Sequence, residues 1–137
     1  MGTVYAGITL KNAFDVTNAQ RGIIGAMDIR QTEVQAVVDT GSMTLIISDE
    51  VRQQLGLEMR GTKITRMANN AKAVVNVTEA VEVHWKNRSM ICQPWVMPDC
   101  DEVLLGVIPL EDMDLMVDPT EQVLVGAHGD EIQGIQY

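Results

Sequence analysis

Residues 36–48 read AVVDTGSMTLIIS and place an acidic turn between two apolar segments. The run 34–38 is rich in β-branched side chains and predicts a buried strand that ends at Asp39-Thr40-Gly41. A carboxylate at such a position costs free energy unless it is hydrogen-bonded or shares a proton with a partner. Gly41 lets backbone amides approach that carboxylate closely. Asp39 is therefore the candidate catalytic group, and the structural alternative is an Asx-type turn that ends the strand.

The rest of the sequence predicts short strands with few helices. Two helices are expected, one from a Ser48 cap to a Gly56 stop and a shorter one at 109–114. Between the first two strands we expect a polar, turn-forming stretch at 12–22 and then an apolar run at 22–29. We expect strands at 3–10, 34–38, 43–47, 64–67, 73–77, 81–85, 90–96, 103–106, 117 and 123–125. The strand at 103–106 is fully apolar and should therefore be central in its sheet. The pattern is that of an all-β domain.

The composition is that of one folded domain. The chain has 137 residues, of which 46% are hydrophobic and 21% charged, so we expect a single core and no disorder. No apolar run reaches the ~18–20 residues of a membrane span. The first residues lack the basic and apolar segments of a secretory signal. We therefore expect a cytoplasmic protein without membrane contacts, in which Cys92 and Cys100 are free thiols.

The charges are unevenly distributed along the chain. Residues 1–88 hold nine acidic and ten basic side chains, a net charge of +1, whereas residues 89–137 hold ten acidic side chains and no Lys or Arg, a net of −10. Such an acidic segment repels phosphate backbones, so nucleic-acid binding is not expected. His84 and His128 stand at no metal-ligand spacing from the cysteines. We expect neither a metal nor a cofactor.

The acidic turn together with its surroundings resembles the retropepsin-like aspartic proteases, in particular their cellular prokaryotic members. The shared order is a catalytic strand and loop, a helix, a hairpin with a polar tip, an apolar-apolar-Gly strand and a short helix. Residues 104–125, LLGVIPLEDMDLMVDPTEQVLV, are very similar to the closing segment of those members. The resemblance implies a small closed β-barrel of the retropepsin type over residues 1–126, followed by a polar tail at 127–137.

Carried over by position, the resemblance implies a role for each residue of the turn. Asp39 matches the catalytic aspartate, while Thr40 and Gly41 match the residues that brace two catalytic loops against each other. Ser42 stands where family members carry Ser or Ala. The segment that packs behind the loop is Leu104, Leu105 and Gly106.

The resemblance also implies a flap over the substrate and shows two departures from the family pattern. The flap tip and its substrate-binding residues match Met67, Ala68, Asn69, Asn70, Ala71 and Lys72. Many relatives have glycine or an Asp-Gly turn where this chain has Asn69 and Asn70. Val107 replaces an arginine that retroviral members use at their dimer interface, so another contact must substitute for it.

Peptide hydrolysis by carboxylates needs two of them, one as general base for water and one as general acid for the carbonyl oxygen. The chain has one Asp-Thr-Gly and is too short for two lobes, so the second aspartate must come from a second copy across a two-fold axis. We therefore expect a homodimeric aspartic endopeptidase that acts on extended peptides. The alternatives are a non-catalytic dimeric β-domain that binds extended peptides by strand addition and a purely structural small β-barrel.

Overall fold

The computed structural model describes residues 2–66 and 69–129, which form mostly strands with a few short helices. The strands are β1 (Tyr5–Asn12), β2 (Gln31–Val38), β3 (Leu45–Ile47), β4 (Met59–Arg66), β5 (Lys72–Thr78), β6 (Val81–Trp85), β7 (Arg88–Cys92), β8 (Trp95–Val96), β9 (Leu104–Leu105), β10 (Leu115–Asp118) and β11 (Val123–Gly126). The helices are α1 (Ala13–Gln20), the 3₁₀ turn η1 (Ala26–Asp28), α2 (Asp49–Leu55) and α3 (Val107–Asp112). The expected all-β class is confirmed. Within the described residues, no helix is long and apolar enough to span a membrane.

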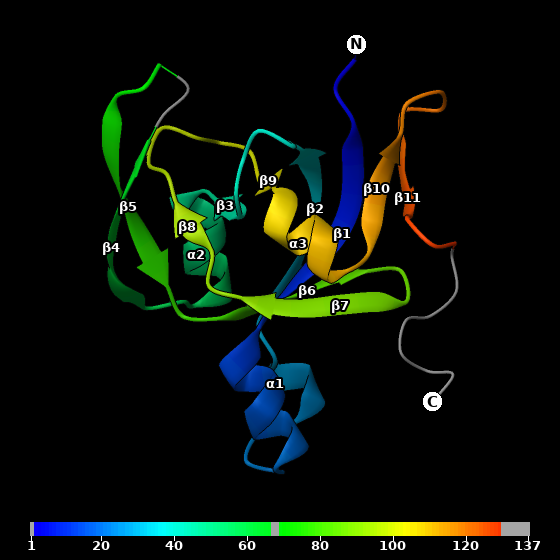
Figure 1. Ribbon diagram of the computed structural model, residues 1–137. Helices are drawn as coiled ribbons and strands as arrows, with labels where there is room; N and C mark the ends of the chain where they lie inside the picture. Colours follow the sequence, from blue (N-terminus) through cyan, green and yellow to red (C-terminus); the bar gives the residue numbers. More distant parts are fainter. Residues whose placement is uncertain (1, 67–68, 130–137) are drawn as a thin grey trace.

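Nine strands form one sheet that curls into a half-barrel, and β10 and β11 form a separate two-stranded sheet (Figure 1). The order of the large sheet is β4-β5-β8-β3-β9-β2-β1-β6-β7. Strand β9 lies in its middle, parallel to β2 and antiparallel to β3. The prediction of a central strand at 103–106 is therefore confirmed. This topology brings the end of β2 and the start of β3 against the same short strand.

The core follows the alternation expected of half-buried strands. In β6, Val81, Val83 and Trp85 are buried while the two residues between them are partly exposed. In β1, Ile8 and Leu10 contribute to the same core. Each such side chain stabilises the fold by roughly 1.5–3 kcal/mol when it is fully removed from water. Ala36 of β2 and Leu105 of β9 belong to the same core, which fixes the position of these two strands.

Helix α2 begins and ends as its sequence predicts. The Ser48 hydroxyl accepts a hydrogen bond from the Val51 amide at 3.2 Å, which caps the first turn. Gly56 ends the helix in the left-handed conformation, with φ of 65°. Leu55 is fully buried and anchors the last turn to the core. Because α2 follows β3 directly, it fixes the strand that leaves the Asp39 loop.

The turn-forming stretch expected at 12–22 is instead mostly helical. The polar stretch forms helix α1, which begins where the Asn12 side chain accepts a hydrogen bond from the Asp15 amide at 3.1 Å. The apolar run that follows contains η1, and Ile23 and Met27 are exposed. Asn12 and Asp15 are themselves buried, so the polar residues at this point of the chain support structure.

The strand expected at 90–96 is also divided. Strand β7 ends at Cys92, and β8 begins at Trp95. Pro94 lies between them and has no N–H to donate to a ladder. The break sends β8 to pair with β3 and β5 while β7 remains beside β6.

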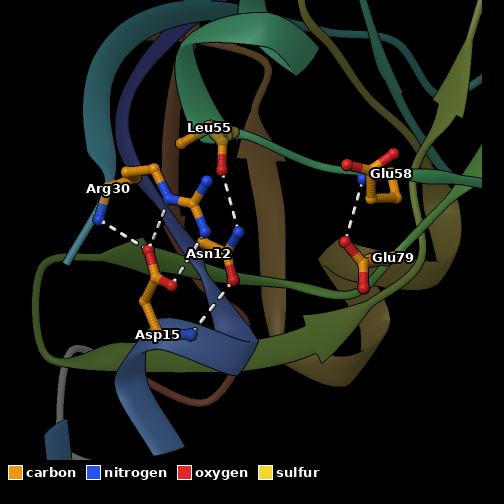
Figure 2. Close-up of polar contacts among 6 residues, drawn as sticks. All are labelled: Asn12, Asp15, Arg30, Leu55, Glu58 and Glu79. Atoms are coloured by element: carbon orange, nitrogen blue, oxygen red, sulfur yellow. Dashed lines mark hydrogen bonds and ion pairs between the residues drawn. The ribbon is translucent and has the colours of Figure 1, made fainter. Parts of the chain in front are cut away.

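A buried polar network joins α1 to the end of α2 (Figure 2). The Asn12 side-chain amide donates to the Leu55 carbonyl at 2.8 Å. The Asp15 carboxylate accepts hydrogen bonds from the Arg30 amide at 3.0 Å, from Nε at 2.8 Å and from Nη2 at 3.0 Å. These bonds, chiefly those of the Arg30 side chain, hold the pKa of Asp15 below its usual value although burial opposes them. The network ties α1 to the rest of the fold.

We expect Asp15→Asn to lower the free energy of unfolding at neutral pH by about 2 kcal/mol, because Arg30 then faces a neutral amide. The value is below that of a fully buried pair because the Arg30 side chain is 51% exposed. Since the folded pKa of Asp15 is lowered, its contribution is complete above the unfolded value of ~3.9 and is lost as the pH falls through the folded value. Urea unfolding from neutral to acid pH measures this difference.

The matched control is Asp49→Asn. The Asp49 side chain is 47% exposed and pairs with Arg52 within the same helix, so solvent screens the interaction. We expect a smaller loss than for Asp15→Asn. Equal losses in the two variants, or a difference from wild type that persists far below pH ~3.9, would contradict the assigned role of the Asp15 network.

Candidate active site

The Asp39 carboxylate is held by its own loop. Its Oδ1 accepts a hydrogen bond from the Gly41 amide at 2.9 Å, and its Oδ2 accepts one from the Ser42 hydroxyl at 2.9 Å. The Ser42 amide closes the turn by donating to the Asp39 carbonyl at 3.0 Å. The bond from Gly41 is the Asx-type turn anticipated from sequence, and the bond from Ser42 adds a second fixed point. The partly exposed carboxylate therefore keeps one orientation.

Strand β9 and the residue after it support this loop from behind. The Asp39 amide donates to the Leu105 carbonyl at 3.0 Å, and the Ser42 carbonyl accepts from the Val107 amide at 2.9 Å. A Cβ atom on Gly106 would lie 2.4 Å from the Thr44 carbonyl oxygen and 2.6 Å from that of Ser42. The two backbones can approach this closely because residue 106 has no side chain. The structure thus brings the predicted 104–106 segment against the predicted catalytic loop.

Thr40 and Gly41 lie exposed at the tip of the loop. Their bracing role, which the resemblance implies, requires a second loop and stays a prediction. The position is suited to such a contact because Asp39, immediately before them, is already anchored at both oxygens.

The β4–β5 hairpin stands to one side of the Asp39 loop (Figure 1). Of the predicted flap tip, Met67 and Ala68 lie outside the described residues. Asn69 accepts a hydrogen bond from the Ala71 amide at 3.0 Å, and Asn70 takes a positive φ of 68°. Arg66 Nη1 donates to the Asn70 carbonyl at 3.1 Å. Asn therefore supplies the turn geometry that glycine provides in many relatives.

A cleft of about 510 Å³ opens beside the Asp39 carboxylate. Its lining comprises Asp39, Gly41, Ser42, Met43, Ile46, Thr65, Arg66, Trp95, Met97, Pro98, Asp99, Cys100 and Leu104. Apolar side chains such as Met43, Ile46 and Trp95 share this lining with the acidic Asp39. Such a combination is typical of sites that bind an apolar ligand and act on it with a few polar groups.

One wall of the cleft was missed by sequence reasoning. Residues 95–100 reach it because β8 pairs in parallel with β3, with Ile46 opposite Trp95. This pairing joins segments that are far apart in the chain, so no local sequence motif predicts it. The one sequence signal for this wall was the pair of large apolar side chains Trp95 and Met97, which lie between two prolines.

The described residues contain no group of three or more His, Cys, Asp or Glu side chains that could hold a metal ion. His84 instead lies 2.8 Å from a Glu82 oxygen, and His128 lies 2.7 Å from an Asp114 oxygen.

The two cysteines differ in their surroundings, and we expect them to differ in reactivity. Burial, with a smaller contribution from the charge of Asp112, raises the pKa of Cys92 to about 12. Cys100 lies in the cleft wall. At about pH 8, iodoacetamide should modify Cys100 while Cys92 remains almost entirely protonated and unreactive. Peptide mapping by mass spectrometry measures modification at both sites. The control is Cys100→Ser, in which Cys92 is the one remaining cysteine and should stay unmodified. Modification of Cys92 at a comparable rate would contradict this assignment.

Two solved structures and one family model are similar to this chain. The retroviral protease-like domain of Ddi1 from Leishmania major has a TM-score of 0.56 and 15% identity over 98% of this chain and 91% of that one. A retropepsin-like aspartic protease from Rickettsia conorii has a TM-score of 0.47 and 20% identity over 86% of this chain and 89% of that one. The family model described as gag-polyprotein putative aspartyl protease matches residues 25–126. No curated protein matches the sequence.

The curled sheet, the hairpin and the Asp-Thr-Gly loop define a retropepsin-like aspartic protease fold. The chain belongs to the gag-polyprotein putative aspartyl protease family. The family resemblance drawn from residues 36–48 and 104–125 is confirmed.

Proposed function

We propose that this protein is an aspartic endopeptidase that works as a homodimer, with Asp39 of each chain forming the catalytic pair. The observation that carries the proposal is the Asp39 carboxylate itself, which Gly41 and Ser42 hold in the lining of a largely apolar cleft. A surface carboxylate of purely structural use needs neither a cleft nor close support by a glycine such as Gly106. Membership of the family supports the same reaction class.

The reaction needs two carboxylates in different protonation states. One acts as general base and removes a proton from water, while the other donates a proton to the carbonyl oxygen of the scissile bond. Two close carboxylates share one proton because both cannot readily ionise. The pKa values of such a pair therefore belong to the two groups together and not to either aspartate alone. Ser42 supports Asp39 by holding Oδ2, which leaves the group oriented for a partner across the two-fold axis. The tip residue Thr40 would brace the two loops.

The substrate is an extended peptide with large apolar side chains. The cleft offers Met43, Ile46 and Trp95 as an apolar surface beside the carboxylate. The β4–β5 hairpin, with its tip at 67–72, would cover the peptide and exclude water from the pair. The hairpin reaches the cleft already beside its tip, since Thr65 and Arg66, the last residues of β4, belong to the cleft lining.

A mixing experiment tests catalysis and assembly together. Purified wild-type chain should cleave an oligopeptide library, and an excess of the Asp39→Asn chain should lower its activity, because mixed dimers hold one carboxylate of the pair. The control is an equal excess of serum albumin, which should leave the rate unchanged. Peptide binding without cleavage would support the non-catalytic alternative, and activity unaffected by the Asp39→Asn chain would refute the shared site.

A further inference from the structure

A second cavity lies outside the proposed active site. It has a volume of about 460 Å³ and is bordered by one face of α1, the start of β4, the β5–β6 turn and the end of β7. Its lining shares no residue with that of the Asp39 cleft. In Figure 1, α1 projects from one end of the molecule while the loop between β2 and β3 lies at the other. We call this cavity the α1 groove.

The α1 groove combines exposed apolar side chains with positive charge. Phe14 is 62% exposed and Ile91 is 61% exposed. Arg60 pairs with Glu79 at 3.0 Å, whereas no carboxylate of the described residues lies within ion-pair distance of Arg21. Two arginines and one glutamate leave the groove a net charge of +1, in a chain whose net charge is −9. The groove is therefore complementary to a ligand that joins an apolar group to a carboxylate.

The groove also lies at a sheet edge. Strand β7 is the last strand of the large sheet, next to β6, and Ile91 and Gln93 at its end border the groove. An edge strand presents backbone N–H and C=O groups that can pair with a further strand. A peptide extended along β7 would place alternate side chains on the same face, which is the arrangement that Ile91 and Phe14 can contact.

From these observations we propose that the α1 groove binds an extended peptide segment in which a large apolar residue is followed, two positions later, by an acidic one, so that both side chains lie on the same face. The apolar side chain packs between Phe14 and Ile91, and the carboxylate pairs with Arg21. The site serves recruitment and carries out no chemistry of its own, so the proposal goes beyond the peptidase function and does not depend on it.

Binding is measured by fluorescence anisotropy with the Asp39→Asn chain, so that no peptide is cleaved. The probe is a short, end-capped, fluorescein-labelled peptide of valine and threonine that contains a phenylalanine and, two positions later, an aspartate. A second probe has asparagine in place of the aspartate. Arg21→Gln should raise the Kd of the aspartate probe about fivefold, near the upper end for an exposed ion pair, and leave that of the asparagine probe unchanged. Phe14→Ser should weaken both probes.

Lys63→Gln is the matched control because Lys63 is exposed and lines neither the α1 groove nor the Asp39 cleft. This variant should bind the aspartate probe with the Kd of its parent. The proposal is overturned if Arg21→Gln leaves the Kd unchanged, if Lys63→Gln weakens binding as much as Arg21→Gln, or if the aspartate probe shows no saturable binding below about 1 mM. Both variants alter exposed side chains, and circular dichroism verifies that each is folded.

Discussion

Asp39→Asn is expected to reduce peptide hydrolysis by about a thousandfold or more, because the pair then lacks the group that accepts and returns a proton. The amide keeps the size of the carboxylate, its oxygen can still accept the hydrogen bond from the Gly41 amide, and its NH2 group can donate to the Ser42 hydroxyl oxygen, so the loop should keep its shape. Initial rates on a peptide selected from the library measure kcat/KM. Sedimentation of the wild-type and variant chains reports whether the proposed dimer forms in both.

The matched control for this variant is Asp101→Asn. Asp101 is exposed in the acidic segment after the cleft wall and is absent from the cleft lining, so its removal changes the net charge by the same amount. We expect its activity to stay within about twofold of wild type. Comparable losses in the two variants would trace the effect to overall charge, and full activity in Asp39→Asn would remove Asp39 from the mechanism.

Gly106→Ala is expected to destabilise the fold by about 3 kcal/mol, at the upper end of the usual cost of overpacking. The new Cβ would lie 2.4 Å from the Thr44 carbonyl oxygen and 2.8 Å from the Thr44 amide nitrogen, which are backbone atoms and cannot rotate away. The loop that carries Asp39 must then shift. A displacement of about 1 Å is enough to cost roughly a hundredfold in rate. The midpoint of urea unfolding and kcat/KM measure the two effects.

Gly61→Ala is the matched control, because a Cβ on Gly61 would meet no atom within 4 Å. Gly61 lies in β4 at the sheet edge, and we expect its replacement to change the free energy of unfolding by less than about 0.5 kcal/mol. If Gly106→Ala were as stable and as active as Gly61→Ala, the close contact of the Gly106 backbone with the backbone of Ser42 and Thr44 would not be needed for stability or activity.

Much of the fold and the central part of the candidate site were predictable because their signals are local. The β-branched run before Asp39, the Ser48 cap with its Gly56 stop and the apolar run at 103–106 each specify a conformation through the residues themselves. The order of these elements was enough to indicate the family, which the comparison confirms.

Helix α1 could not be predicted in this way. Residues 13–20 carry no apolar stripe that packs into the core, and the helix instead depends on the buried Asn12 cap and on the pair between Asp15 and Arg30. Arg30 lies outside the helix and approaches Asp15 only in the folded chain. A helix that is stabilised by residues outside it shows few of the usual helix signals in its own sequence.

The sequence by itself determined the Asp39 turn, helix α2 and the central strand, since capping, β-branching and glycine act over a few neighbouring residues. Tertiary structure alone decided which walls surround Asp39. Trp95 reaches the cleft through the parallel pairing of β8 with β3, and Gly106 reaches the loop through the pairing of β9 with β2. Strand pairing is set by burial of the whole core, and that energy belongs to no single segment.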